Sequence, residues 1–484
     1  MTLSEIVNGL DDRRLIGPET EIIGITHDSR QVQNGFCFVC LEGLRFDGHE
    51  FAMQAVQQGA NTVLVQRKLD LPPEIAQIIV KDSRAAMAHI AANFYGNPAR
   101  KLKLIGITGT NGKTTTTHMV KAVLETAGYK MGMMGTNANY IGQRKLPQQL
   151  TTPDPVEFHA LLAEMVREQC DAVVMEVSAH ALALRKMEGV KFDVAVFTNF
   201  TQDHLDYFGT MEEYFEAKKR LFAPDMCRMA VINADSEWSH LLSDNPRALQ
   251  ITYGIENEAN ISAADLKLRP NGMRFSMRMM RQNMDISLKL AGRFNVYNCM
   301  AAAGACYMLG VPAEKILEGL QSIEGVSGRF ELLPVPGKDY IVVLDYAHSP
   351  DSLKNALDTA RELVGERKLI CVFGCGGDRD KEKRPLMGEI SCRAADYTIV
   401  TTDNPRFEAP EEILEQIAQG CMAVNGHYIT MVDRRQAIEH ALNCARGGDI
   451  VIIAGKGHEE YQDILGVKHP FSDKEVVAEY MMRG

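Results

Sequence analysis

The chain has 484 residues, of which 45% are hydrophobic and only 7% aromatic, an ordinary composition for a water-soluble globular protein. It is too long for a single hydrophobic core, so we expect two to four domains. Asp and Glu number 63 against 52 Lys and Arg, giving a net charge of -11. That charge argues against a general affinity for nucleic acid or for an anionic membrane.

Neither a targeting signal nor a membrane span is visible in the sequence. Residues 1–14 lack both the basic and the apolar segment of a secretory signal, and no apolar run approaches the ~18 residues that a membrane span needs. The 11 cysteines are scattered and odd in number, which suits a reducing compartment. We therefore expect a cytoplasmic protein without membrane insertion.

Cys37 and Cys40 form a Cys-x-x-Cys pair within the apolar stretch 36–41. Alternation in this stretch places one face of a strand in a core, and no second pair of ligands follows. We interpret both cysteines as core residues and not as zinc ligands.

Segment composition divides the chain into three blocks, which we expect to be domains of residues 1–98, 99–330 and 331–484. Strand and helix patterns alternate within them, and this alternation predicts parallel sheets covered on both faces, with ligands at the carboxyl ends of the strands. The expected fold class is α/β: a smaller N-terminal domain, a central P-loop domain and a C-terminal Rossmann-like domain. Strands are expected at 36–41, 61–65, 77–80, 104–108, 171–177, 193–198, 229–232, 340–344, 368–373, 397–401, 428–432 and 450–454. One helix is expected at 83–94, a second follows the strand at 104–108 and ends at Gly128, and a third begins at about residue 296.

A glycine-rich segment follows the strand expected at 104–108 and precedes a helix. Such a turn presents backbone N–H groups to phosphates, Lys113 would reach the terminal phosphates, and the Thr114 hydroxyl would bind Mg²⁺. The spacing departs from the usual P-loop, because five residues and not four separate Gly106 from Gly112. A plain strand-to-helix turn would need neither the lysine nor the run of threonines. We therefore predict an ATP site that includes Gly109, Thr110, Asn111, Gly112, Lys113, Thr114 and Thr115.

Two further residues at strand ends could hold a metal ion. Glu176 closes the apolar stretch 172–175, where an unpaired carboxylate is costly to bury, so pairing with a metal or a cation is favoured over a structural role. His204 follows the strand expected at 193–198. Alone it would be an ordinary core or surface histidine, but beside a P-loop it becomes a candidate metal ligand.

The motifs along the chain resemble those of the Mur ligase family. The resemblance runs in constant order from about residue 24 to 475, so it covers nearly the whole chain, and its specificity comes from the order of many motifs. The motifs are 26–30 (Thr-His-Asp-Ser-Arg), 108–114 (Thr-Gly-Thr-Asn-Gly-Lys-Thr), 176–182 (Glu-Val-Ser-Ala-His-Ala-Leu), 203–207 (Asp-His-Leu-Asp-Tyr), 216–222, 294–298, 328–329, 345–348 (Asp-Tyr-Ala-His), 374–379, 403–406 (Asp-Asn-Pro-Arg) and 455–459 (Gly-Lys-Gly-His-Glu).

The resemblance implies an ATP-dependent ligase of peptidoglycan precursor synthesis that acts as a monomer. In the branch it points to, the γ-carboxylate of UDP-N-acetylmuramoyl-L-alanyl-D-glutamate becomes an acyl phosphate, which the amine of meso-diaminopimelate then attacks. Two anions meet in the first step, so the site must supply positive charge. The family pattern assigns this role to Lys113 and two Mg²⁺, one held by Thr114 and Glu176 and the other near His204 and a carbamylated Lys218. Without the resemblance, Lys218 would read as part of a solvated helix face.

The remaining site residues are implied by the same resemblance. For ATP they are Asn295, Arg329, Asp345 and His348; for the UDP-sugar peptide they are Ser29, Thr151, Thr152, Ser178 and Lys186; and for diaminopimelate they are Arg379, Asp403, Asn404, Pro405, Arg406, Gly455 and Glu459.

The sequence departs from the family pattern at three positions. Ala179 replaces a usual serine, Phe208 replaces a common histidine, and Lys186, with Arg185 beside it, stands where an arginine contacts substrate. These departures concern substrate affinity and not the phosphate chemistry. The alternatives are the same ligation with L-lysine, a folylpolyglutamate-synthetase-like ligase and an inactive Mur-like scaffold. Intact Lys113, Glu176, His204 and Lys218 argue against the last of these.

Overall fold

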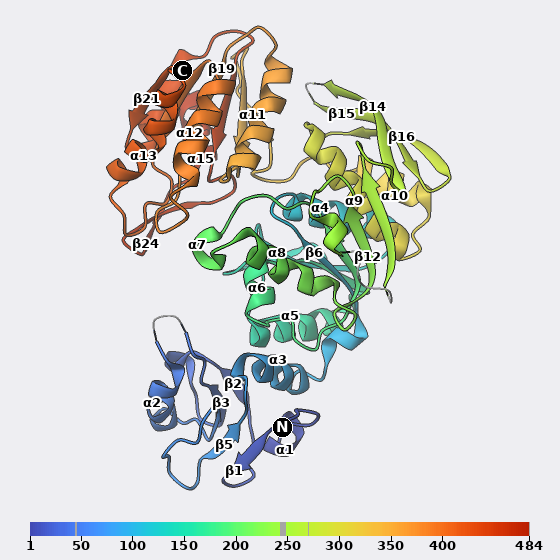
Figure 1. Cartoon of the computed structure of the whole chain (residues 1–484), viewed down its shortest axis with the longest axis vertical. Coiled ribbons are helices and arrows are strands. Elements are labelled where there is room, and N and C mark those ends of the chain that lie inside the picture. Colours follow the sequence, from blue (N-terminus) through green and yellow to red (C-terminus); the bar gives the residue numbers. More distant parts are fainter. Residues whose placement is uncertain (44–45, 243–247, 270, 484) are drawn as a thin grey trace.

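The structure is a computed structural model that describes residues 1–43, 46–242, 248–269 and 271–483. Three sheets, each covered by helices, follow one another along the chain (Figure 1). We call the parts built on them the N-terminal, central and C-terminal domains. The central domain lies between the other two (Figure 1), and the expected α/β class with several domains is confirmed.

The N-terminal domain has a five-stranded sheet in which β1 is antiparallel and the other strands are parallel. Both faces of this sheet are buried, as the apolar strands require. Cys37 packs in the core beneath α1 and α3, whereas Cys40 packs in the core beneath α2. The two thiols therefore belong to different cores. The elements are α1 (Leu3–Ile6), β1 (Arg14–Ile16), β2 (Gly24–Thr26), β3 (Phe36–Val39), α2 (Ala52–Gln57), β4 (Thr62–Val65), β5 (Ala76–Ile79) and α3 (Ser83–Phe94).

The central domain has an eleven-stranded sheet, in the order β16-β15-β14-β13-β12-β11-β6-β10-β7-β8-β9. Its middle strands are parallel, and antiparallel hairpins extend both edges. Helices α4, α9 and α10 cover one face, while α5 and α8 cover the other. The elements are β6 (Lys103–Thr108), α4 (Lys113–Thr126), β7 (Met131–Met134), β8 (Asn139–Ile141), β9 (Arg144–Leu146), α5 (Pro155–Arg167), β10 (Ala172–Glu176), α6 (Ala179–Ala183), β11 (Phe192–Phe197), α7 (Leu205–Phe208), α8 (Met211–Lys219), β12 (Cys227–Asn233), β13 (Leu249–Gly254), β14 (Ile261–Arg269), β15 (Gly272–Met279), β16 (Gln282–Leu288), α9 (Arg293–Met308) and α10 (Ala313–Gln321).

The C-terminal domain has a six-stranded sheet, in the order β17-β18-β22-β19-β20-β21, with only β17 antiparallel. Helices α11, α12 and α13 cover one face, and α14 and α15 cover the other. The elements are β17 (Glu331–Leu333), β18 (Ile341–Asp345), α11 (Pro350–Val364), β19 (Leu369–Phe373), α12 (Lys383–Ala394), β20 (Tyr397–Thr401), α13 (Pro410–Ala423), β21 (Tyr428–Met431), α14 (Arg434–Cys444), β22 (Ile450–Ala454), β23 (Tyr461–Ile464), β24 (Val467–Pro470) and α15 (Asp473–Arg483).

The ends of several elements shift slightly from their expected positions. Helix α9 begins at Arg293, a turn earlier than expected, directly after Gly292 at φ +97°. A short 3₁₀ helix at Pro98–Lys101 lies at the expected boundary between the first two domains. Among the described residues, no helix is both long and apolar enough to cross a membrane.

A buried ion pair ties α14 to α15. Arg434 Nε and an Nη atom each donate to Asp473 at 2.7 Å, and both side chains are fully buried. Removing one partner would leave an uncompensated charge in the core. We therefore expect Arg434→Met to lower the free energy of unfolding by about 3–5 kcal/mol, as measured by chemical denaturation. The neighbouring Arg435 pairs with Glu479 at the surface, so Arg435→Met should cost less than about 1 kcal/mol. Equal losses for the two variants would contradict this reading.

Candidate active site

The loop between β6 and α4 depends on two glycines. Gly109 has φ +148°, and a Cβ there would lie 1.9 Å from Thr198 Oγ1 on the loop after β11. Gly112 has φ +83°, and its Cβ would lie 2.3 Å from Asn298 Oδ1 of α9. A larger residue fits at neither position. Close packing therefore holds the loop with its backbone against the start of α4, as a phosphate-binding loop requires.

Lys113 is the first residue of α4, and its ammonium folds back over the loop. Its Nζ donates to the carbonyl oxygens of Gly109 at 2.9 Å and Thr110 at 2.8 Å. Burial lowers the pKa of Lys113, while the charge of Glu176 opposes the shift. The ammonium is thus already at the loop that would hold phosphates.

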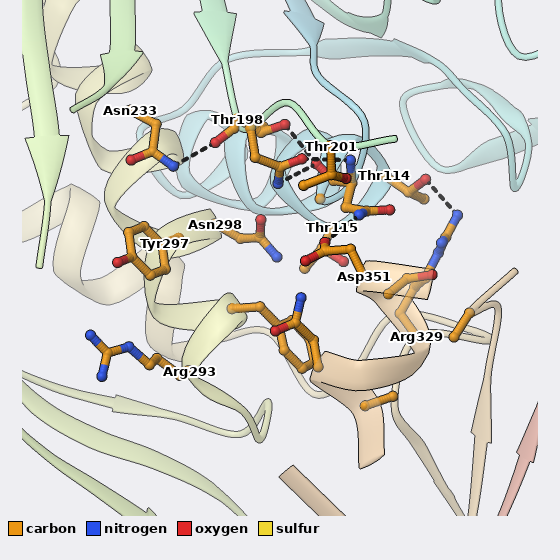
Figure 2. Close-up of a pocket in the computed structure, with 18 of the residues that line it drawn as sticks. Thr114, Thr115, Thr198, Thr201, Asn233, Arg293, Tyr297, Asn298, Arg329 and Asp351 are labelled. Carbon is orange, nitrogen blue, oxygen red and sulfur yellow. Dashed lines mark hydrogen bonds between the residues drawn. The ribbon is translucent and has the colours of Figure 1, made fainter. Parts of the chain in front are cut away.

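Glu176 ends β10 and is 1% exposed. Its oxygens accept from Thr114 Oγ1 at 3.1 Å, from Thr136 Oγ1 at 3.0 Å and from the Thr136 N–H at 2.8 Å. The guanidinium of Arg329 donates to the same Thr114 hydroxyl at 2.9 Å (Figure 2). A carboxylate and a hydroxyl side by side are the oxygen ligands that suit Mg²⁺.

Lys218 of α8 lies beneath the other side of the loop. It is 1% exposed, its Nζ donates to Gly109 O at 2.9 Å, and the ammonium lies 4.4 Å from the ring centre of Tyr214. Burial lowers the pKa of Lys218 well below its usual value, and Lys113 adds to the shift. The reading of Lys218 as a solvated helix residue is therefore excluded.

His204 precedes α7 with φ +55°, and its ring lies edge-on to that of His180, with centroids 4.8 Å apart. Burial lowers the pKa of His204 to about 3, so the imidazole is neutral and free to bind a metal at neutral pH. A lysine ammonium cannot bind a metal. Lys218 could therefore join His204 as a ligand only after losing its proton, and a carbamate on it would offer the oxygen atoms that Mg²⁺ prefers.

Asp203 joins the central domain to the C-terminal domain. Its carboxylate is 3.4 Å from His204 Nε2, 3.8 Å from His348 Nε2 and 3.9 Å from Lys383 Nζ. Burial would raise the pKa of Asp203, but these neighbours lower it below its usual value. No role for Asp203 or Lys383 was expected from the sequence. Lys383 sits in a charged run that reads as a solvated surface, yet it is 5% exposed.

A cavity of about 550 Å³ opens between the central and C-terminal domains (Figure 2). The start of α4, the ends of β11 and β12, α9 and the segment after β18 form its walls. Asn111 Nδ2 bridges the domains by donating to Asp351 at 2.8 Å. Of the residues expected to bind ATP, the lining includes Asn111, Gly112, Thr114, Thr115, Arg329, Asp345 and His348.

Asn295 lies behind the cavity wall. Its amide donates to Ala291 O at 2.7 Å, and its Oδ1 accepts from Asn298 at 3.0 Å. Asn298, one turn further along α9, lines the cavity instead. Both asparagines stand in the 294–298 motif, and the helical turn between them directs Asn298, and not Asn295, into the cavity.

A second polar cluster surrounds Asn404 in the C-terminal domain. Asn404 Nδ2 donates to Glu459 at 2.8 Å, and Lys456 Nζ donates to Asn404 Oδ1 and to Glu459 at 3.0 Å. Asp403 lies 3.8 Å from the same ammonium and packs against Gly455, where a Cβ would lie 2.5 Å from its carboxylate. Lys456, which the sequence analysis quoted without a role, is fully buried.

Arg406 adopts φ +51°, which is uncommon for a residue with a side chain. Its guanidinium donates to Gly377 O at 2.6 Å, and its backbone pairs with the β23–β24 hairpin. Gly377 also packs against the carbonyl of Pro405. The segments 374–379 and 403–406 therefore lie together, and Arg379 is exposed at their edge.

Three of the residues expected to hold the UDP-sugar peptide, Thr151, Thr152 and Ser178, lie around the carboxyl end of β10. Thr152 Oγ1 donates to Glu176 O at 2.9 Å and accepts from Ser178 N at 3.0 Å, and Thr151 contacts Thr136 at 3.1 Å. Thr152 therefore contacts the backbone of Glu176, and Thr151 contacts Thr136, which donates to the Glu176 carboxylate.

The N-terminal domain meets this region through carboxylates. Lys186 Nζ is 2.8 Å from Asp154, and His27 lies 3.8 Å from the same carboxylate. The neighbouring Arg185 pairs with Asp82 at 2.6 Å. Ser29 begins a short 3₁₀ helix near His27. Both candidate substrate-binding cations at 185–186 therefore already have carboxylate partners.

A glycine loop at a helix start, a buried Thr–Glu pair and an interdomain cavity define a P-loop nucleotide-binding enzyme. Three family models match the chain: "Mur ligase family, catalytic domain" over residues 21–95, "Mur ligase middle domain" over 107–306 and "Mur ligase, glutamate ligase domain" over 328–457. The chain belongs to the Mur ligase family.

Individual relatives agree with this assignment. The chain is 43% identical to the UDP-N-acetylmuramoyl-L-alanyl-D-glutamate–2,6-diaminopimelate ligase of Syntrophomonas wolfei, over 100% of this chain and 99% of that protein. A solved structure of a ligase with the same name is 32% identical, with a TM-score of 0.67 over 96% of this chain and 95% of the other. Folylpolyglutamate synthase of Mycobacterium tuberculosis, solved with ADP and AMPPCP, shares the fold at 17% identity, with a TM-score of 0.63 over 83% of this chain and 95% of that one.

Asp345 generates a prediction about pH. Burial raises the pKa of Asp345 to about 6, although Arg329 and the N–H of Phe330 oppose the shift. An acid whose pKa is raised on folding contributes stability below its unfolded pKa and loses it as the pH rises through the folded value. Between pH 5 and 7 the wild type should therefore lose about 1 kcal/mol relative to Asp345→Asn. Urea denaturation at both pH values measures this difference, and a pH-independent difference would contradict it.

Proposed function

We propose that the chain is an ATP-dependent ligase that joins meso-diaminopimelate to UDP-N-acetylmuramoyl-L-alanyl-D-glutamate. The observation that carries the proposal is the closeness of two sites: Tyr346 lines the nucleotide cavity, and its hydroxyl contacts Glu459 of the Asn404 cluster at 3.4 Å. A kinase would have no use for a second, amino-acid site beside its phosphates. Sequence identities of 43% and 32%, over 100% and 96% of this chain, with two ligases of this name support the same substrates.

The two rival ligases are less well supported. The similarity to folylpolyglutamate synthase extends over less of the chain and at much lower identity. L-lysine lacks the second carboxylate of diaminopimelate, so a site for lysine would need no cation at that end of the amino acid. Arg406 stands beside the Asn404 cluster and could bind such a carboxylate. We also propose the cytoplasm as the location, because the reaction needs ATP, and a monomer, because all parts of the proposed site belong to one chain.

The first step brings the γ-carboxylate of D-glutamate to the γ-phosphate of ATP. An oxygen of the carboxylate attacks phosphorus, the bond to ADP breaks, and an acyl phosphate forms. The backbone of 109–114 and Lys113 would bind the phosphates, and Arg329, already bonded to Thr114, would place a second cation there. These charges counter the repulsion between the two anions, and more strongly in a site closed to water.

In the second step the amine nitrogen attacks the acyl carbon, phosphate leaves and the nitrogen loses its proton. Asn404, Glu459 and Arg406 would orient the amino acid, since a guanidinium holds a carboxylate through two parallel hydrogen bonds. The backbone of Gly455 and the side chains of Asp403 and Arg379, with the loop set by Pro405, would complete that site. Orientation of the amine toward the acyl carbon is the main contribution of these residues.

Two Mg²⁺ would neutralise the phosphates and draw charge from the reacting carboxylate when bound. Thr114 and Glu176 have the oxygen ligands for one. We propose His204 and carbamylated Lys218 for the other. The lowered pKa of Lys218 supports this role, because only the neutral amine combines with carbon dioxide.

Ser29, Thr151, Thr152, Ser178 and Lys186 remain our candidates for the UDP-sugar peptide. Thr152 and Ser178 contact each other and the backbone of Glu176, so a peptide bound there would end near the metal ligands. Lys186 would contact the substrate either while it remains paired with Asp154 or after that ion pair opens.

Lys218→Ala tests the carbamate. We expect kcat to fall by about 100-fold or more, while the Kd for ATP changes less than about threefold, because the group acts on the transition state and not on nucleotide binding. Phosphate release by the wild type and the variant, in bicarbonate-buffered and bicarbonate-free solution, measures kcat. The matched control is Lys219→Ala, since Lys219 is more exposed and pairs with Glu216. Near-wild-type turnover of Lys218→Ala would reject the role.

Arg406 tests the choice of amino acid. A site built around a charge should reject a substrate lacking the partner, so kcat/KM for L-lysine should be about 10⁴-fold below that for meso-diaminopimelate. Arg406→Ala should raise the KM for diaminopimelate by about 100-fold with a smaller change for ATP. Arg393→Ala, which removes an exposed arginine of the same domain, is the control. Comparable kcat/KM values for both amino acids in the wild type would contradict the choice of diaminopimelate and the role of Arg406.

A further inference from the structure

Tyr346 lies between the nucleotide cavity and the Asn404 cluster and contacts both. On one side the guanidinium of Arg329 lies 4.6 Å from the centre of its ring, and the same guanidinium donates to Thr114 at 2.9 Å. On the other side its hydroxyl donates to Glu459 Oε1 at 3.4 Å. An unbroken series of contacts therefore runs from Thr114 through Arg329 and Tyr346 to Glu459.

Glu459 cannot move freely at the far end of this series. Its second oxygen accepts from Asn404 at 2.8 Å and from Lys456 at 3.0 Å. Lys456 is fully buried, so displacing the carboxylate would leave a buried ammonium with a partner removed, which is costly. A ligand that fixes Asn404 and Glu459 therefore fixes the acceptor of the Tyr346 hydroxyl.

The backbone before Arg329 is packed directly on the loop that carries Glu459. Gly328 has φ +69°, and a Cβ there would lie 2.3 Å from His458 N. Gly457 has φ +51°, and its Cβ would lie 2.8 Å from both Gly328 O and Tyr346 Cβ. With no side chain between them, the two segments must shift together.

We propose that Tyr346 is a positioning residue that couples occupancy of the amino-acid site to the placement of Arg329 on the nucleotide. Amino-acid binding adds a ligand contact to the Glu459 carboxylate that Asn404 and Lys456 already hold. Glu459 holds the Tyr346 hydroxyl, and the ring holds the guanidinium of Arg329 toward the phosphates. The inference rests on the proposed function. Because coupling between two binding sites is reciprocal, each ligand raises the affinity for the other by the same factor.

The hydroxyl and the ring of Tyr346 have separable effects. Tyr346→Phe removes only the bond to Glu459, whereas Tyr346→Leu also removes the aromatic face beneath Arg329. The phenylalanine variant should bind Mg²⁺–AMPPNP alone like the wild type, and the leucine variant should bind it more weakly by about fivefold or more. Loss of the coupling in Tyr346→Phe, with nucleotide binding alone intact, is the result that a merely structural role would not give.

The experiment is a titration of Mg²⁺–AMPPNP by calorimetry, with the UDP-sugar dipeptide present and with or without saturating meso-diaminopimelate. The amino acid should tighten nucleotide binding in the wild type, and the effect should shrink to less than about twofold in Tyr346→Phe. Steady-state assays should give that variant a raised KM for the amino acid and a raised KM for ATP, each measured with the other substrates saturating, because the coupling is reciprocal. Tyr340→Phe is the control, because the buried Tyr340 hydroxyl has no hydrogen-bond partner among the described residues.

Wild-type turnover separates this inference from the proposed function. If the wild type uses L-lysine and not diaminopimelate, the proposed substrate is wrong and the same titration is run with lysine. Full coupling retained in Tyr346→Phe would overturn the role of the hydroxyl. Unchanged AMPPNP affinity in Tyr346→Leu, which needs no amino acid to measure, would overturn the role of the ring.

Discussion

The carboxylate of Glu176, buried at the end of an apolar strand, is the constraint on which the site depends. An unpaired charge at that depth would cost several kcal/mol or more, so the fold surrounds it with donors. Thr114 comes from α4, Thr136 from the segment after β7, and Arg329 reaches Thr114 from the start of the C-terminal domain. Satisfying one carboxylate thus brings together the phosphate loop, the central sheet and the neighbouring domain.

Two buried lysines converge on the phosphate loop. Lys113 and Lys218 both donate to the carbonyl of Gly109, from opposite sides of one loop. Neither has a carboxylate within ion-pair distance among the described residues, and burial lowers the pKa of both. A buried ammonium without a charged partner is costly, and phosphates bound at this loop would supply the partner that Lys113 lacks.

The connection between the central and C-terminal domains is polar around the cavity, while Ala291 and Phe294 of the central domain pack against the apolar core of the C-terminal domain. Asn111–Asp351, Arg329–Thr114 and the group around Asp203 all cross the cavity between the central and C-terminal domains. Polar contacts of this kind can be exchanged for contacts to a ligand at little cost, whereas a large apolar interface would resist opening.

The sequence by itself determined the α/β class, the strand-to-helix position of the phosphate loop and the identity of the family. Alternation of apolar strands with helices and the order of the motifs are local properties, so they need no coordinates. The tertiary structure decided which member of each motif faces the site. Asn298 and not Asn295 lines the cavity because the turn of α9 points it there. Nothing local in the sequence indicates that Lys383 and Lys456 are buried, since only the packing of distant segments sets the depth of a side chain. Contacts between residues far apart in the chain, such as Tyr346 with Glu459, have no local signature, and only the fold could place them together.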